Sequence, residues 1–201
     1  MPLELPEVHL RSFSNEEINA LPLRRYEGPV DVVRTDAQRK AAMKRLRDEP
    51  VLGFDTETRP VFRKGQKPNL PSLIQLATAD RVYLFQLSAL PFSDGLCDLF
   101  KEKAVVKAGV SVRDDVRDLQ KLAQFKPGGF VDLGEVSHTL NMQTHGLRNL
   151  AANLLGFRIS KAAQCSNWAK QRLTRQQITY AATDAWVSRE LYLAFRELGA
   201  L

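Results

Sequence analysis

Hydrophobic residues fall into short runs from about residue 30 onward, and their spacing predicts a sheet accompanied by helices. Apolar runs of strand length occupy residues 30–33, 51–57, 70–78, 81–86 and 105–110. Helical spacing occurs over residues 36–47, 92–103, 133–140, 147–155 and 174–198. Asp36 is the expected N-cap of the first helix, and Ala79-Asp80 the expected hairpin turn. Strands come mainly before helices, so we expect one α/β domain with a mixed sheet flanked by helices.

The first 29 residues follow no such pattern. They show little periodicity and contain Pro2, Pro6, Pro22 and Pro29. We therefore expect residues 1–29 to form an extended arm or a partner-binding segment, and residues 30–201 to form the folded domain.

Two acids end the second predicted strand, in the sequence Phe54-Asp55-Thr56-Glu57. Because strand side chains alternate between faces, Asp55 and Glu57 point the same way and Thr56 points the other way. Neighbouring carboxylates repel each other, and a divalent cation that prefers oxygen ligands is the usual compensation. The alternative is an ordinary strand end whose acids face water.

A third acid, Asp115, lies on the inner face of a predicted helix that begins at about residue 113. The apolar stripe of this helix contains Val112, Asp115, Val116, Leu119, Leu122 and Ala123. Asp114 falls on the outer face, where an acid near the helix start is favoured by the helix dipole. A carboxylate on an inward stripe is costly unless it is paired or bound to metal, so Asp115 is the candidate ligand.

The last predicted helix places Tyr180 and Asp184 one turn apart on its apolar side. Ala181 and Ala182 between them leave room for a close approach. A structural hydrogen bond between the phenol and the carboxylate is the alternative reading. If all four acids converge, two divalent ions about 3.5–4 Å apart would relieve their repulsion and suit cleavage of a phosphodiester.

These residues also carry a family resemblance. Three segments resemble the exonuclease motifs of the DEDD superfamily, tyrosine subclass: Phe54-Asp55-Thr56-Glu57, Lys107-Ala108-Gly109-Val110 leading to Asp115, and Tyr180-Ala181-Ala182-Thr183-Asp184. Further segments are similar to the Werner-syndrome exonuclease group and, more distantly, to ribonuclease D: Ser72-Leu73-Ile74-Gln75-Leu76, Val82-Tyr83-Leu84-Phe85, and Cys165-Ser166-Asn167-Trp168. The resemblance runs from about residue 30 to the end.

The resemblance implies a ribonuclease-H-like fold and removal of nucleotides from 3′ ends with two Mg²⁺ or Mn²⁺ ions. Carried over by position, Asp55 would bridge both metals, Glu57 and Asp184 would complete the site of the attacking water, and Asp115 would serve the second metal. Tyr180 would orient or deprotonate that water, and an ordinary phenol pKa near 10 favours orientation. The similarity to the Werner group favours DNA as substrate, while RNA stays open.

The sequence differs from the relatives that it resembles in two ways, and both affect the expected function. Asn167 stands where ribonuclease D relatives commonly have aspartate, which favours the Werner-like group. Neither a helicase nor the additional helical domains of ribonuclease D accompany the motifs, so we expect a stand-alone nuclease module that depends on a partner for processivity or targeting.

Positive charge is concentrated where acids are absent. Residues 136–183 contain no Asp or Glu but six basic residues, among them Arg148 and Lys161. A second acid-free segment follows the first motif and contains Arg59, Arg63, Lys64 and Lys67. Basic surfaces of this kind suit the phosphates of nucleic acids, although a solvated basic face or an exposed hairpin tip is the alternative. The substrate contacts that we expect are Thr56, Arg59, Arg63, Lys64, Arg148, Lys161 and Trp168.

Composition narrows the classes of protein to which this chain could belong. The chain has 44% hydrophobic and 26% charged residues, an ordinary balance for a globular domain. It has no apolar run long enough for a membrane span and no leader-like start, and its two cysteines, Cys97 and Cys165, are far apart. We therefore expect an intracellular, cytoplasmic protein without a membrane or zinc site. Its oligomeric state is not readable from the sequence.

Two rival functions fit less well. An aspartyl phosphatase would need an aspartate where Glu57 stands and a hydroxyl one residue beyond Thr58. A nucleic-acid-binding module without catalysis is the stronger rival, although such a module would be expected to lack one of the four acids. A nucleotide-triphosphate enzyme is disfavoured because the glycine-rich phosphate loop is absent.

Overall fold

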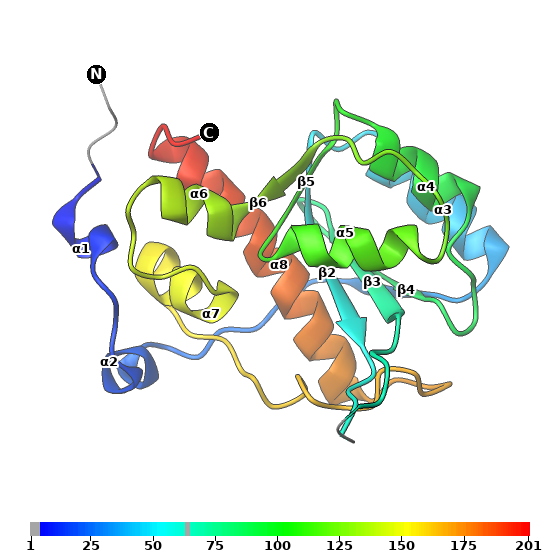
Figure 1. Cartoon of the computed structure of the whole chain (residues 1–201), viewed down its shortest axis with the longest axis horizontal. Coiled ribbons are helices and arrows are strands. Elements are labelled where there is room, and N and C mark those ends of the chain that lie inside the picture. The colour runs from blue at the N-terminus through cyan, green and yellow to red at the C-terminus, as the bar shows by residue number, and fades with distance from the viewer. Residues whose placement is uncertain (1–4, 63–64) are drawn as a thin grey trace.

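A six-stranded mixed sheet forms the centre of the protein (Figure 1). The structure is a computed structural model that describes residues 5–62 and 65–201. The strands are β1 Val30–Val33, β2 Val51–Thr58, β3 Pro71–Ala77, β4 Val82–Gln86, β5 Val106–Gly109 and β6 Phe130–Asp132. Their order across the sheet is β1-β4-β3-β2-β5-β6. The expected α/β fold with a mixed sheet is thus confirmed.

Helices cover both faces of this sheet. They are α1 Glu7–Leu10, α2 Asn15–Ala20, α3 Asp36–Leu46, α4 Asp94–Lys101, α5 Val112–Gln120, α6 Leu133–Thr139, α7 Leu147–Leu150 with the π-helical turn Ala151–Leu155 directly after it, and α8 Arg175–Glu197. None of the helices among the described residues is long and apolar enough to span a bilayer.

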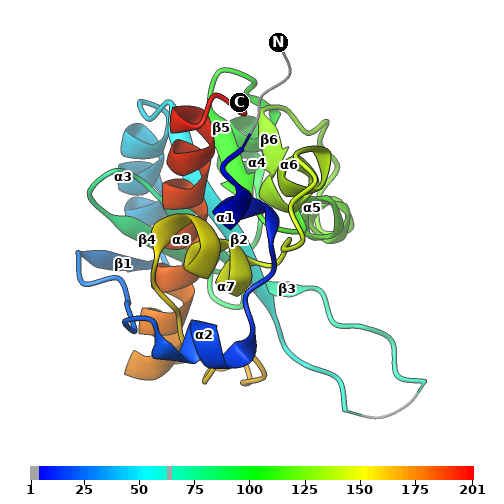
Figure 2. The same ribbon diagram turned by 90° about the vertical axis from the view of Figure 1, so that its left-hand side faces the viewer.

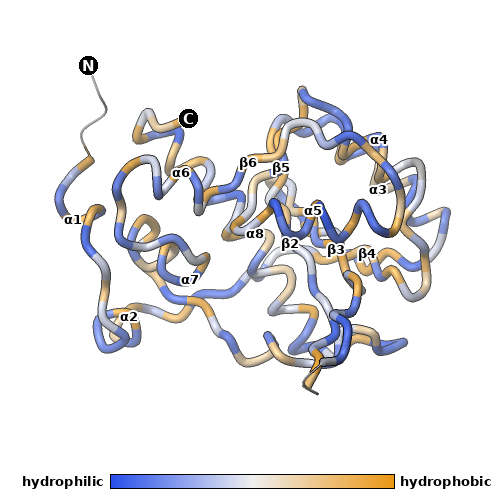
Figure 3. The backbone as a smooth tube through the Cα atoms, in the orientation of Figure 1, coloured by the Kyte–Doolittle hydropathy of each residue, from blue (hydrophilic) through white to orange (hydrophobic). Residues whose placement is uncertain are grey.

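Side-chain alternation along the central strands divides the interior into two layers. Leu52 and Phe54 of β2 share one core with residues of α3, α4 and α5. Leu73 and Ala77 of β3 face the opposite way and pack with the alanines of α8. Figure 3 shows the α5 helix as mostly hydrophilic positions interrupted by hydrophobic ones, as expected for a helix with one buried side. The sheet therefore carries α8 on one face and α5 on the other.

The β2–β3–β4 meander has the predicted hairpin. β3 runs antiparallel to both β2 and β4, and the amide of Thr78 donates to the carbonyl oxygen of Arg81 at 2.8 Å across the Ala79-Asp80 turn. The connection from β2 to β3 extends away from the domain (Figure 2). Residues 63–64 of that connection lie outside the described part of the chain.

The segment before β1 differs from the extended arm that we expected. It contains two short helices and lies along the domain, where the Asn153 side chain bonds His9 and the amide of Gln143 donates to the carbonyl oxygen of Leu10. Leu23 forms an isolated parallel bridge with Arg158. α2 begins with a capping box at Ser14, a helix signal that the scattered prolines obscured.

Three other details differ from the predicted elements. Thr35, and not Asp36, is the N-cap of α3, because its hydroxyl accepts from the Gln38 amide and Gln38 returns the bond. β6 was not expected; its three residues pair only with β5, so periodicity could not reveal it. α5 ends at Gln120, which leaves Leu122 of the predicted stripe exposed.

Candidate active site

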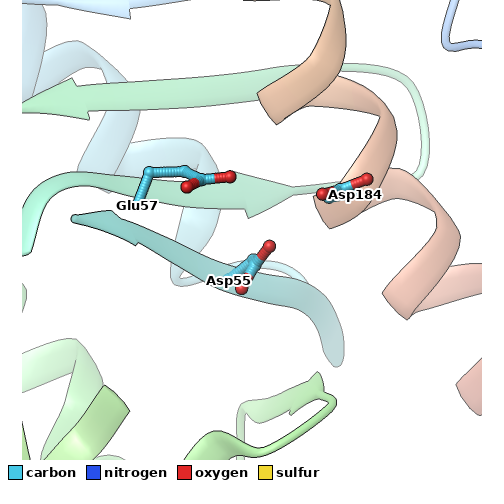
Figure 4. Close-up of side chains that lie close together, drawn as sticks. All are labelled: Asp55, Glu57 and Asp184. Atoms are coloured by element: carbon cyan, nitrogen blue, oxygen red, sulfur yellow. The ribbon is translucent and has the colours of Figure 1, made fainter. Parts of the chain in front are cut away.

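Three of the predicted acids meet near the C-terminal end of the central strand β2, where α8 packs against it (Figure 4). Asp55 and Glu57 come from β2 and Asp184 comes from α8, and one carboxylate oxygen of each lies within 4.8 Å of the others. Glu57 and Asp184 are buried and Asp55 is half-buried. The two residues of β2 face α8, as strand alternation predicted, and α8 brings Asp184 to them from 127 positions further along the chain.

Close contact between α8 and β2 makes this meeting possible. Gly53 faces α8 one strand step before Asp55, and a Cβ atom there would lie 1.9 Å from the carbonyl oxygen of Ala185. Ala181, Ala182 and Ala185 are all fully buried. The alanines beside Asp184 therefore allow the close approach that their position between Tyr180 and Asp184 suggested, and the element that approaches is the sheet.

The start of α8 is held by the segment that precedes it. Thr174 caps the helix in a reciprocal capping box with Gln177. The side-chain amide of Gln177 also donates to Ser166 Oγ at 2.9 Å and to the carbonyl oxygen of Asn167 at 3.1 Å. These bonds give the Ser166-Asn167 pair a structural role, because they anchor the helix that carries Tyr180 and Asp184.

Asp115 lies beside the cluster on the other side of β2. Its carboxylate accepts a hydrogen bond of 2.5 Å from the Thr56 hydroxyl, while the Thr56 amide donates to Asp55 at 2.9 Å. Thr56 thus links Asp115 to Asp55. Asp114 is exposed and forms an ion pair with Arg117 at 2.9 Å, so the predicted division between an inward Asp115 and an outward Asp114 is correct.

A tight turn between β5 and α5 sets the position of Asp115. Gly109 passes so close to β2 that a Cβ atom there would lie 2.4 Å from the carbonyl oxygen of Phe54. Ser111 then adopts the left-handed conformation at φ 62°, and its amide donates to Asp132 at 3.2 Å. This close approach requires glycine at position 109, although a lone glycine indicates little in the sequence.

Burial raises the pKa of every acid in this group, and the charges of the other acids add to the shift for Asp55 and Glu57. Burial is the largest cause for Asp55, whose pKa lies well above its usual range and is raised further by the charges of Asp115, Asp184 and Glu57. The pKa of Glu57 rises to about 9, chiefly by burial and then by Asp184 and Asp115. Those of Asp115 and Asp184 rise to about 7 through burial, although bonds from Thr56 and Tyr180 oppose the shift.

Tyr180 shares a hydrogen bond with Asp184, as the one-turn spacing predicted. Burial raises the pKa of this phenol far above its ordinary value, and the charges of Asp184 and Glu57 raise it further. The hydroxyl therefore stays protonated at neutral pH and can donate a hydrogen bond.

The donor set fits hard divalent cations. Carboxylate oxygens are the ligands that Mg²⁺ and Mn²⁺ prefer, and three of them already lie close enough together to share an ion. The raised pKa values show that the acids repel each other without a positive partner. A bound cation would remove this repulsion and lower the same pKa values.

A cavity of about 360 Å³ opens above the acids. Its lining includes the acidic residues Asp55, Glu57 and Asp184 together with Tyr180, and the basic residues Arg148 and Lys161. Arg148 is oriented by the N-terminal segment, because its Nη2 donates to Asn19 Oδ1 of α2 at 2.7 Å. Two of the expected substrate contacts therefore face the same space as the acids, where positive charge can meet a phosphate.

The other expected contacts are placed differently. Trp168 is fully buried and packs against the Tyr180 ring with 5.9 Å between centroids, so it supports the tyrosine and offers no face to a substrate. Thr56 lines the cavity but is occupied with Asp115. Arg59 is exposed at the base of the β2–β3 connection, away from the cavity lining, and Arg63 and Lys64 lie outside the described residues.

Gln75 is a neighbour of the site that the motif analysis left without a role. It lies opposite Asp55 in the β2–β3 pair, is fully buried, and both polar atoms of its side chain lack a hydrogen-bond partner among the described residues. A single amide in an otherwise apolar strand was the signal available in the sequence.

Comparison with known proteins agrees with this arrangement. A family model described as 3′–5′ exonuclease matches residues 30–199. The chain belongs to the 3′–5′ exonuclease family. The family consists of hydrolases that cleave phosphodiester bonds, the class of enzyme predicted from the motifs, and the acid cluster agrees with its use of divalent metal ions.

Individual relatives of the family share a similar domain. A bifunctional 3′–5′ exonuclease/ATP-dependent helicase WRN from Mus musculus is 34% identical over 161 residues, which cover 77% of this chain and 11% of that protein. DNA polymerase I of Aquifex aeolicus is 31% identical over 159 residues, covering 79% of this chain and 26% of the polymerase. The chain therefore spans a small part of these relatives.

A solved structure confirms the fold over nearly its whole length. The Nibbler EXO domain of Aedes aegypti superposes with a TM-score of 0.77 at 27% identity, covering 89% of this chain and 92% of that domain. The mixed sheet with its flanking helices is thus the ribonuclease-H-like fold of an exonuclease domain.

Proposed function

We propose that this chain removes nucleotides one at a time from the 3′ end of DNA, and that it belongs to the tyrosine subclass of the family. The observation that carries the proposal is the meeting of Asp55, Glu57 and Asp184 within 4.8 Å, with Asp115 linked to them through Thr56. Three segments distant in sequence supply these acids, so their meeting is a property of the fold. Tyr180 completes the group by its bond to Asp184.

The acids divide into two sets of ligands for Mg²⁺ or Mn²⁺. Asp55, Glu57 and Asp184 would hold one ion, and Asp115 with Asp55 would hold the second. When bound, the ions acidify the attacking water and stabilise charge on the phosphate. The protein supplies the ligand positions: β2 presents Asp55 on the face toward α8, while Thr56 holds Asp115 on the other side.

The remaining side chains bind and orient the substrate. Tyr180, protonated at neutral pH, donates a hydrogen bond and so aligns the attacking water; it does not act as the base. Arg148 and Lys161 bind the phosphate near the scissile bond from across the cavity. Arg59, and by their basic character in the sequence Arg63 and Lys64, are proposed to bind the substrate more weakly.

DNA is the proposed substrate because the relatives most similar in sequence include a DNA polymerase. The test compares 5′-labelled DNA and RNA of matched sequence, each single-stranded or with a recessed 3′ end, in Mg²⁺ or Mn²⁺. Successive shortening of DNA from its 3′ end supports the proposal. Faster shortening of RNA would overturn the choice of DNA while leaving the polarity intact.

Adjacent acids offer a matched control for the site itself. Asp115→Asn should reduce the rate about a hundredfold or more, because it removes a ligand, whereas Asp114→Asn should leave the rate within about twofold. Wild-type protein that binds single-stranded DNA but releases no nucleotide would favour the rival, a binding module without catalysis. Products released first from the 5′ end would contradict the proposed polarity.

A further inference from the structure

A second and larger cavity lies next to the active-site cavity. It has a volume of about 1060 Å³ and lies between residues 23–28, the turn at residues 160–163 and the first half of α8. Ser160 and Tyr180 line both cavities, so the two spaces adjoin at the tyrosine. Residues 23–28 precede the part of the chain that matches the family, residues 30–199. This wall of the groove is supplied by the segment that precedes β1.

Positive charge dominates the lining of this groove. Three arginines face it, Arg24, Arg25 and Arg175, against one acid, Glu27. Arg25 pairs with Glu27 at 3.6 Å. The ion pairs of the described residues include neither Arg24 nor Arg175, and both are exposed. Two guanidinium groups are thus available to bind an anionic ligand.

Aromatic rings also line the groove. Tyr26, Tyr180 and Trp186 line the groove, and each is half-buried. Trp186 is held in place by Phe157, which stacks on it at 5.6 Å with 4° between the ring planes, and by Tyr26 at 6.1 Å. Rings fixed in this way offer flat surfaces on which unpaired bases can stack.

The wall formed by residues 23–28 is firmly attached to the domain. The Tyr26 amide donates to Thr183 Oγ1 of α8 at 3.0 Å, and its hydroxyl donates to the carbonyl oxygen of Asp80 at 3.0 Å. The Arg24 amide donates to the carbonyl oxygen of Arg158 at 2.9 Å. The groove is thus a preformed feature, and binding a ligand there would not require the segment to be ordered first.

We propose that this groove binds the single-stranded part of the substrate, the nucleotides on the 5′ side of the one being removed. The inference rests on the proposed exonuclease function and extends it to a second stretch of polynucleotide. Unneutralised arginines suit the phosphates, and fixed aromatic rings suit unpaired bases, a combination typical of sites for single strands. The shared Tyr180 places this stretch next to the scissile bond.

The test uses the full chain with two arginines replaced, Arg24→Ala together with Arg175→Ala. The matched control is Arg47→Ala with Arg196→Ala, which removes the same charge from exposed positions outside both cavities. Binding of a 5′-fluorescent single strand of about 12 nucleotides is followed by anisotropy in EDTA, which stops hydrolysis. We expect Kd to rise about tenfold in the groove variant, and the slope of log Kd against log salt to fall by about 1.4. The control should change neither by more than about a third of those amounts.

Two further measurements separate the groove from the active site. Hydrolysis of the p-nitrophenyl ester of thymidine 5′-monophosphate requires the acid cluster alone and should be unchanged in the groove variant. A strand carrying 5-iodouracil near its 3′ end should crosslink to Tyr26 or Trp186 upon irradiation. Three results would each overturn the proposed role of the groove. They are loss of ester hydrolysis in the groove variant, crosslinks confined to other parts of the chain, and strand binding by the groove variant equal to that of the control. Wild type that binds the strand through the groove but hydrolyses neither substrate would overturn the proposed exonuclease instead.

Discussion

Two regions of this protein bury charge, and they do so in opposite ways. Lys107 of β5 is fully buried, and its ammonium donates to the carbonyl oxygens of Leu99, Glu102 and Val105 at 3.1, 2.6 and 2.8 Å. The Phe130 ring lies 5.1 Å from the same nitrogen. Every donor of the lysine is therefore satisfied within the protein.

The acid cluster lacks such a balance. Asp55, Glu57 and Asp184 have each other as neighbours. Burial raises the pKa of all three, and like charges raise those of Asp55 and Glu57 further. The Lys107 ammonium has three acceptors inside the fold, although burial lowers its pKa to about 8. The clustered carboxylates would be stabilised by a cation from outside. Lys107 is thus a structural residue, and the acids are candidate ligands.

The largest expected effect is a loss of activity when an acid of the cluster, and not Lys107, is replaced. Asp184→Asn should lower exonuclease activity by a factor on the order of 10³, because it removes a cation ligand. The same change should raise the free energy of unfolding in EDTA by about 1 kcal/mol, because one repelling charge is gone. Rate measurements and thermal unfolding test both statements. Glu197→Gln, an exposed acid on the same helix, should alter neither, and a stability loss in Asp184→Asn would contradict the contrast.

Replacing Lys107 should have the reverse outcome, a loss of stability with little change in activity. Lys107→Met would leave three buried carbonyl oxygens without a donor and should lower the free energy of unfolding by about 3 kcal/mol. For a chain of this size that corresponds to a fall in Tm of about 6–12 °C. Activity per folded molecule should stay close to that of wild type. The exposed Lys103→Met serves as control, with an expected change below about 0.5 kcal/mol.

The smallest expected effect is a pH dependence of the metal-free protein. The folded pKa values of Asp115 and Asp184, about 7, exceed their ordinary value of 3.8, and that of Glu57, about 9, exceeds 4.5. In that range the folded state binds protons that the unfolded state has released, so stability falls as pH rises. We expect the free energy of unfolding to fall steadily between pH 5 and 8 in EDTA.

Saturating Mg²⁺ should reduce that loss, because the cation replaces the protons. Denaturation at several pH values, with EDTA or Mg²⁺, measures the difference. Glu57→Gln should remove the part of the decline that extends toward pH 9. Stability that rises with pH in EDTA would show that the acids are not repelling each other in the folded state.

Local patterns were sufficient to predict most of the fold and the identity of the acids. The alternation of β2 determines that Asp55 and Glu57 share a face, and the one-turn spacing determines the contact between Tyr180 and Asp184. The same periodicity correctly separated Asp115 from Asp114. The division into an arm and a domain at residue 30, and a cytoplasmic location, stay predictions.

Tertiary structure decided what these local patterns could not. The acids meet because Gly53 and the alanines of α8 let helix and strand approach closely, which depends on residues distant in sequence fitting together. The same packing places Trp168 inside the protein, although its position in a motif suggested a substrate contact. Residues 5–29 carry few regular signals and acquire their place through bonds to the domain, so only the folded chain shows that they line a groove. A sequence determines the faces of each element by its period, whereas the distances between elements depend on how their surfaces pack.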